Sequence, residues 1–181
     1  MRSKIVLFIS CFLFTTSIML ISCSSDDDNN SYNGNQIVLH VEDENGELFQ
    51  DGDIIVFNEV GGTNGRPGEG AGRLNYFMKN VSNQDINVKL EVVDIRGTDG
   101  SLFTFCVQPI CVFDIEVGDI YPSNGTIIAP NQYNSQDDYF INNDPGTDDT
   151  NSIEYDIRFF VEDANGNRSN EMTITYKYMP N

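Results

Sequence analysis

The stretch that decides the fold is 153–179, IEYDIRFFVEDANGNRSNEMTITYKYM. From 153 to 161 an apolar side chain stands at every second position, and polar side chains fill all but one of the places between. A period of two predicts a strand with one buried face and one wet face. The pair Asn165-Gly166, in which both residues tolerate positive φ, predicts a tight turn into a second alternating strand over 171–179. The stretch therefore predicts a β-hairpin at the edge of a hydrophobic core.

The same alternation is present upstream, where Ile86, Val88, Leu90 and Val92 share one face of a predicted strand. Clusters of Gly, Asn, Asp and Pro separate short strand-like runs along the rest of the chain. By contrast, 123–152 is expected to be mostly loop, with several prolines and many Asn and Asp residues. The pattern predicts an all-β fold, an immunoglobulin-like antiparallel β-sandwich. The expected strands are 36–42, 53–60, 73–80, 86–95, 102–107, 111–117, 126–129, 153–162 and 171–179.

The first expected strand contains His40, which is the single histidine of the chain. Ile37, Leu39 and Val41 would share one face of this strand, so His40 would point the other way. One histidine without partners cannot form a nucleophilic triad or a histidine-rich metal site. We expect His40 to be a surface or packing residue and expect no enzyme activity.

The N-terminus has the order of an export signal. Arg2 and Lys4 form a basic head, and 5–22 follows without a charge. The run LISC at 20–23 resembles the lipobox of bacterial lipoproteins, in which a small residue precedes a lipid-bearing cysteine. The resemblance implies that 1–22 is a signal peptide and that Cys23 is the lipidated first residue of the mature chain. The alternative is an uncleaved transmembrane anchor over the same apolar run.

Residues 23–35 are polar and acidic after the cysteine, with the sequence SSDDDNNS at 24–31. A run without apolar residues cannot bury surface, so it predicts a flexible tether ahead of one domain over 36–181. The run is similar to the acidic export signal of surface lipoproteins of Bacteroidota. This resemblance implies that the protein faces outward from the outer membrane, and the periplasmic face is the alternative.

The charge of the chain limits its partners. Loss of Arg2 and Lys4 with the signal peptide would change the formal net charge from −18 to −20. Phosphates would be repelled, which argues against binding of nucleic acid or of an anionic membrane through the protein surface. The excess of acidic side chains leaves divalent cations as possible ligands. The candidates for Ca²⁺ are the carboxylates of a single acidic segment: Asp137, Asp138, Asp144, Asp148 and Asp149.

The spacing of these aspartates does not match a calcium-binding helix-loop-helix motif, so a solvated acidic loop is the alternative. No other cofactor is expected.

Cys106 and Cys111 remain after Cys11, in the signal peptide, and Cys23 are set aside. An exported protein meets an oxidising compartment, which predicts a disulfide between them. The C-x4-C spacing differs from the C-x-x-C of thiol redox enzymes, so a structural hairpin link is expected.

Two tyrosines of the loop-rich segment 123–152, Tyr133 and Tyr139, are candidates for contact with a protein or a glycan, and packing of their rings is the alternative. The region 73–178 looks like the immunoglobulin-like modules of secreted Bacteroidota proteins, which are mostly non-catalytic. Together these resemblances imply a surface lipoprotein that binds a protein, as an accessory subunit of an outer-membrane transport, secretion or assembly complex. The alternative function is a glycan-binding surface lipoprotein.

Overall fold

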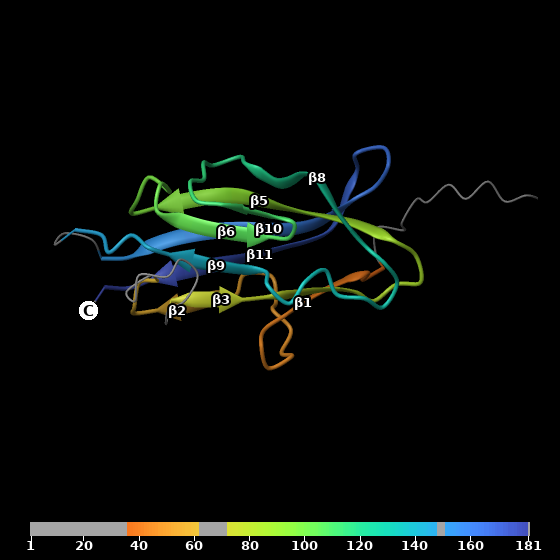
Figure 1. Ribbon diagram of the computed structural model, residues 1–181, viewed down its shortest axis with the longest axis horizontal. Coiled ribbons are helices and arrows are strands. Elements are labelled where there is room, and N and C mark those ends of the chain that lie inside the picture. Colours follow the sequence, from red (N-terminus) through yellow and green to blue (C-terminus); the bar gives the residue numbers. More distant parts are fainter. Residues whose placement is uncertain (1–35, 62–71, 148–150, 181) are drawn as a thin grey trace, which may run out of the picture.

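The computed structural model describes residues 36–61, 72–147 and 151–180. The predicted signal peptide, Cys23 and the tether lie outside these residues. The described part of the chain folds into strands joined by turns, stacked as two layers around one core (Figure 1). This arrangement confirms the predicted all-β sandwich. No helix in these ranges is long and apolar enough to cross a membrane.

One layer is a five-stranded sheet with the order β2-β11-β10-β5-β8. The hairpin predicted at 153–179 forms its centre, and the strand bounds are β2 Ile54–Phe57, β5 Ile86–Arg96, β8 Ile120–Ile128, β10 Ile153–Glu162 and β11 Arg168–Tyr178. Neighbouring strands run antiparallel except β2, which lies parallel to β11 with Ile54 opposite Thr175. The sheet therefore has β2 at one edge and β8 at the other.

The second layer contains a four-stranded sheet, β3-β9-β6-β7, and a two-stranded sheet, β1-β4. Its strands are β1 Leu39–Glu42, β3 Arg73–Asn75, β4 Phe77–Asn80, β6 Phe103–Val107, β7 Ile110–Val112 and β9 Tyr139–Asn142. Only Tyr76 separates β3 from β4, so the two sheets continue into one another along the chain. A bridge between Lys79 and Tyr133 extends the layer beside β4.

The core between the layers is aromatic. Phe103 of β6 stacks on Tyr155 of β10 with ring centroids 3.9 Å apart, and Phe140 of β9 lies 6.3 Å from Phe159. The alternating residues of β10 that were expected to point inward, from Ile153 to Val161, are all fully buried. Burial of aromatic and aliphatic side chains from both layers supplies the apolar contribution to the stability of the fold.

The outer face of the five-stranded sheet carries a network of ion pairs. Arg96 of β5 contacts Asp94, Glu154 and Asp156, and Lys177 of β11 also pairs with Glu154. Hydrogen bonds from Lys177 and Arg96 lower the pKa of Glu154 to about 2. Most basic side chains of this sheet are thus held by carboxylates of neighbouring strands.

One side chain of this outer face departs from the alternation. Phe160 is fully buried there beneath the guanidinium of Arg168, which lies 4.2 Å from the ring centroid. The register of β10 and β11 shifts between Phe159 and Val161, next to this ring.

The structure corrects the sequence predictions at four places. Residues 139–142, expected to be loop, form β9, because β3 and β6 supply hydrogen-bonding partners on both sides. The expected strand 126–129 begins at Ile120, whereas the expected strand 111–117 is the short β7. The strand expected over 36–42 starts at Leu39. Ile37 is consequently 67% exposed, and Val38 is buried in its place.

Candidate functional site

The candidate site is a groove beside β1, and two turns build it. The first turn, 43–46, begins with Asp43, whose carboxylate accepts hydrogen bonds from the N–H groups of Asn45 and Glu47. These bonds lower the pKa of Asp43 even though partial burial of the carboxyl raises it. Gly46 completes the turn at φ 79°, a conformation that favours glycine. The chain then returns along β1, where the Phe49 N–H donates to the Val41 carbonyl.

The second turn, 50–53, leads the chain away from β1. The Gln50 N–H donates to Oδ2 of Asp53, and the Gly52 N–H donates to the Thr173 carbonyl of β11. Oδ1 of Asp51 accepts a hydrogen bond from the Thr173 N–H. Because the returning chain leaves β1 after Phe49 and joins β11 only at Thr173, a gap opens between β1 and the start of β11.

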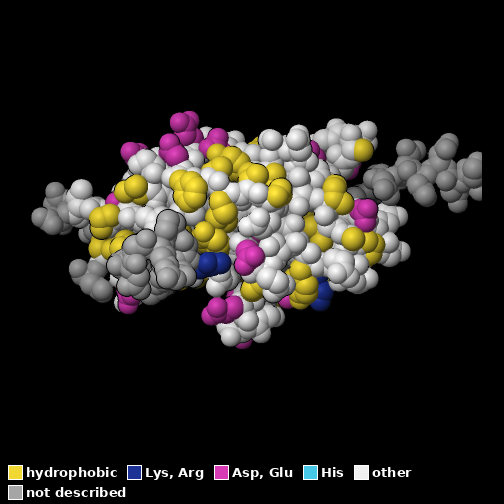
Figure 2. Space-filling view, viewed as in Figure 1, with side chains coloured by type: hydrophobic (Ala, Val, Ile, Leu, Met, Phe, Trp, Pro, Cys, Tyr) yellow, Lys and Arg dark blue, Asp and Glu magenta, His cyan; other side chains and the backbone are white. Residues whose placement is uncertain are grey.

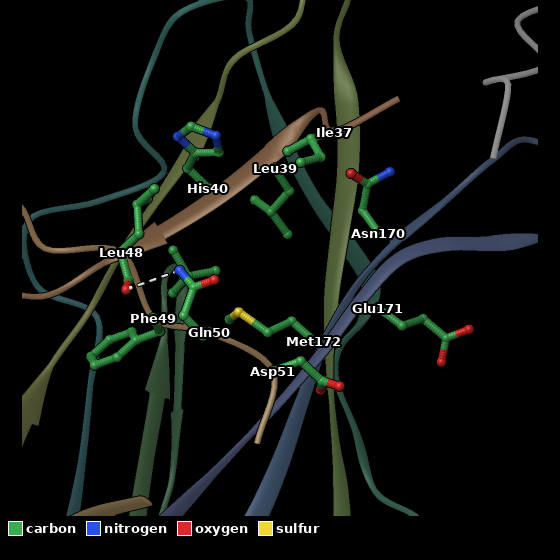
Figure 3. A pocket seen from close by; sticks show the side chains of 11 residues that line it. Ile37, Leu39, His40, Leu48, Phe49, Gln50, Asp51, Asn170, Glu171 and Met172 are labelled. Atoms are coloured by element: carbon green, nitrogen blue, oxygen red, sulfur yellow. Dashed lines mark hydrogen bonds between the residues drawn. The ribbon is translucent and has the colours of Figure 1, made fainter. Parts of the chain in front are cut away.

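This gap is an open groove of about 270 Å³ (Figure 3). Leu39 and Met172 extend into it from opposite sides, and Ile37 and His40 lie at its upper rim. The apolar lining is Ile37, Leu39, Val41, Leu48, Phe49 and Met172. Ile37 is 67% exposed and Leu48 is 44% exposed, so the apolar surface continues from the groove onto the rim.

The polar rim of the groove is mostly neutral or acidic. Its side chains are His40, Gln50, Asp51, Asn170 and Glu171, so no Ser, Thr or Cys lines the groove. On the face drawn in Figure 2, acidic side chains surround scattered apolar ones and few basic side chains are visible. The lining thus contains two carboxylates and one histidine but no hydroxyl or thiol nucleophile. Apolar side chains with a polar rim suit binding of another molecule.

The groove lies beside the first described residues of the chain. The Val38 N–H donates to Oδ1 of Asn170 at 2.8 Å, which fixes the first described residues against the start of β11. His40 of β1 stands opposite Lys79 of β4, and Lys79 bridges to Tyr133. The groove and Tyr133 therefore belong to the same end of the sandwich.

Tyr133, a predicted contact residue, lies beside a second and shallower hollow of about 230 Å³. Its hydroxyl donates to Oε2 of Glu42 at 2.9 Å, and Nζ of Lys79 lies 5.0 Å from its ring centroid. Phe77 and Gln136 also line this hollow. Tyr133 is 38% exposed, which leaves part of its ring open to solvent.

The second predicted contact residue, Tyr139, lies opposite Asn75, and the guanidinium of Arg73 covers its ring at 3.8 Å from the centroid. The four residue steps from Asn75 to Lys79 correspond to roughly 13 Å of extended chain. The structure therefore does not bring Tyr133 and Tyr139 together as one aromatic platform.

Three of the acidic residues proposed for Ca²⁺ lie in the described part of the chain, and their surroundings differ. Asp137 is exposed, whereas Asp138 is fully buried and accepts hydrogen bonds from the Gln108 N–H and from Nδ2 of Asn134. Burial raises the pKa of Asp138.

Asp144 accepts hydrogen bonds from Thr98 and from the Gly146 N–H, and Asp148 and Asp149 lie outside the described residues. Within the described ranges no group of three or more His, Cys, Asp or Glu side chains is placed to hold a metal ion.

The predicted disulfide is present. Cys106 of β6 and Cys111 of β7 are bonded and stand directly opposite each other in the hairpin. The bond joins the two strands at the edge of the four-stranded sheet. Asp138 fixes the turn of the same hairpin through Gln108, so the hairpin is held at two points.

Sequence patterns did not reveal the groove. Its lining comes from β1, from the chain after the first turn and from the start of β11, which are far apart in the sequence. The one available signal was an apolar residue, Leu48, in a polar stretch two positions after the Asn45-Gly46 turn.

No protein-family model and no curated protein sequence matches the chain. Among solved structures, the N-terminal domain of PorA superposes with a TM-score of 0.45 at 12% sequence identity. The match covers 77% of this chain and 96% of that one.

Proposed function

We propose that this chain is a non-catalytic lipoprotein of the outer-membrane surface, and that its domain binds another protein. In this proposal it serves as an accessory subunit of an envelope transport, secretion or assembly complex. The observation that carries the proposal is the open groove beside β1, where apolar Ile37 and Leu48 remain exposed within a strongly acidic surface. Exposed apolar surface with a polar rim is typical of protein interaction sites.

The place of the groove supports a partner close to the membrane. The described chain begins at the groove, and the predicted tether of 23–35 would join the domain there. Thirteen residues span at most about 45 Å when fully extended. A partner bound at the groove would therefore lie within that reach of the bilayer, which favours a partner that is itself a membrane protein.

Site-specific photo-crosslinking in intact cells tests the binding role. A photoreactive amino acid at Leu48 should give one defined crosslinked product, whereas the same group at Ile127 should give none. Ile127 is a matched control because it is 64% exposed and lies on β8, at the far edge of the five-stranded sheet. Recovery of uncrosslinked monomer alone from the Leu48 position would contradict the proposal.

The anchor has its own test. Cys23→Ser removes the thiol that would carry the diacylglycerol, and stable anchoring by acyl chains requires the lipid. The variant should keep its signal segment and lose processing at Ser22, and mass spectrometry of the mature wild type should show a lipid on Cys23. A wild-type N-terminus without lipid would refute the anchor and leave the groove proposal intact.

Glycan binding is the second candidate, and the hollow beside Tyr133 favours it. A partly open tyrosine ring next to Glu42 and Gln136 offers a stacking surface and hydrogen-bonding groups to a sugar. Binding on a glycan array that Tyr133→Ala abolishes and Leu48→Asp leaves unchanged would establish this alternative.

A further inference from the structure

The outer edge of β2 is an open strand edge. β2 is the terminal strand of the five-stranded sheet, and β11 is its partner. The Thr175 N–H donates to the Asp53 carbonyl, and the Met179 N–H donates to the Phe57 carbonyl. Successive residues of a strand turn their backbone groups to opposite edges, so Ile54 and Val56 direct theirs away from β11. Within the described residues no strand pairs with this edge.

The side chains on this edge are apolar and exposed. Ile54 is 61% exposed, Val56 is 55% exposed, and Met179 continues the apolar surface beyond the end of β11. Natural proteins usually protect an edge strand with lysine, proline or a bulge. β2 has the sequence IIVF and carries none of these. The opposite edge strand, β8, contains Pro122 and an irregular register with β5.

The charges around β2 select among possible occupants. Asp51 and Asp53 precede the strand and Glu59 follows it. A second copy paired antiparallel through β2 would bring the aspartates of one chain toward Glu59 of the other. Each chain also carries a formal net charge of −18, so two copies repel one another. A peptide segment with basic residues at both ends would complement the charges at both ends of β2, and a second copy of the chain would not.

We infer that the outer edge of β2 receives an extended segment of a partner protein, apolar at its centre and basic at both ends. The segment becomes a sixth strand of the sheet, with backbone hydrogen bonds to Ile54 and Val56. Main-chain bonds provide the attachment, and the flanking carboxylates select lysine or arginine. This edge meets the groove beside β1 only at Asp51, and its backbone groups belong to Ile54 and Val56, which do not line the groove. The inference therefore stands whether or not the groove binds a partner.

Amide hydrogen exchange on the full chain, purified in detergent, tests the inference with a defined probe. The probe is the synthetic peptide Lys-Lys-Val-Ile-Val-Ile-Lys-Lys. Its addition should slow exchange of the Ile54 and Val56 amides by about tenfold or more, because these N–H groups gain acceptors. The same peptide with N-methyl groups on all four central backbone nitrogens cannot donate hydrogen bonds from either edge, and it should lose this effect.

Two further comparisons complete the test. A peptide with glutamate in place of lysine should bind about tenfold more weakly because of the flanking carboxylates. The variants Ile54→Lys and Val56→Pro should each abolish binding, and Ile127→Lys on β8 should preserve it. Ile54 and Val56 are exposed and their backbone groups face away from β11, so unfolding midpoints should stay close to wild type.

Several results would overturn the inference. Absence of binding, or equal binding of the N-methylated peptide, would exclude strand addition. If the peptide slowed amide exchange at Leu39 and not at Ile54 and Val56, the peptide-binding site would be the groove beside β1. A dimer in sedimentation experiments that Ile54→Lys dissociates would make the occupant a second copy of the chain.

Discussion

The hydroxyl of Tyr155 donates a hydrogen bond to Oδ1 of Asn142 at 2.8 Å, and both side chains are fully buried. Tyr155 belongs to β10 of the five-stranded sheet, and Asn142 ends β9 in the opposite layer. The Asn142 N–H also donates to the Tyr176 hydroxyl of β11 at 3.2 Å. A polar link therefore crosses an otherwise largely apolar core and fixes β9 against the central hairpin.

Tyr155→Phe should lower the free energy of unfolding by about 1–1.5 kcal/mol, because it removes one buried hydrogen bond while the ring remains. Chemical denaturation measures the change. Tyr133→Phe is the matched control, since its hydroxyl bonds Glu42 at the surface, and it should cost less than about 0.5 kcal/mol. Equal losses for the two variants would show that the cross-layer hydrogen bond contributes no more to stability than the one at the surface.

Asp138→Ala should lower the free energy of unfolding by about 1–3 kcal/mol, because the Gln108 N–H and the Asn134 amide lose a buried acceptor. For Asp138→Asn, the difference in the free energy of unfolding from wild type should depend on pH. Burial raises the pKa of Asp138 in the fold, so its ionisation costs stability as pH rises from the ordinary range through the raised pKa.

Asparagine does not titrate, so the stability of Asp138→Asn relative to wild type should improve between pH 4 and pH 7. Denaturation midpoints at both pH values check this. A constant difference across the range would mean that the pKa of Asp138 is unperturbed.

Glu154→Gln should lower the free energy of unfolding at pH 7 by about 1–2 kcal/mol, because Glu154 pairs with both Arg96 and Lys177. The fold lowers the pKa of Glu154 to about 2, so its contribution is present above the ordinary value near 4.5 and is lost as pH falls toward 2. Wild type and variant should therefore converge in acid. Glu44→Gln, on the exposed first turn, serves as a control expected to have little effect.

Reduction of the Cys106–Cys111 disulfide should lower the free energy of unfolding by about 2 kcal/mol, the value that the chain-entropy relation gives for so short a loop. Comparison of denaturation curves with and without reductant measures it. The double variant Cys106→Ala and Cys111→Ala should be insensitive to reductant. A loss well above 2 kcal/mol in reduced wild type would indicate that the hairpin itself unfolds.

Local patterns predicted the central elements well. The strand expected over 153–162 coincides with β10, and the alternating apolar residues of 86–92 are buried as expected. In these strands each residue faces either the core or the solvent. Apolar and polar side chains therefore alternate along the sequence, and the strand can be predicted from them. The disulfide could be predicted because only two cysteines remained outside the predicted signal and lipidation segment, and an exported chain would meet an oxidising compartment.

β9 could not be predicted from its own residues. Tyr139–Asn142 has four residues without alternation, and Phe140, Ile141 and Asn142 are all buried. A short segment of this kind becomes a strand only when β3 and β6 offer backbone partners on both sides. The same reasoning applies to Asp138, which looks like part of a solvated acidic loop but is buried beneath the turn at Gln108.

The amino-acid sequence alone determined the strand alternation, the turn chemistry, the cysteine pair and the acidic character, because each of these depends on residues adjacent along the chain. Tertiary structure decided which apolar residues stay exposed. Ile37 and Leu48 border a groove, and Ile54 and Val56 form an open edge, only because distant segments end or diverge beside them. Packing between segments that are distant along the chain sets the exposure of these side chains. It therefore cannot be predicted from a pattern of a few adjacent residues.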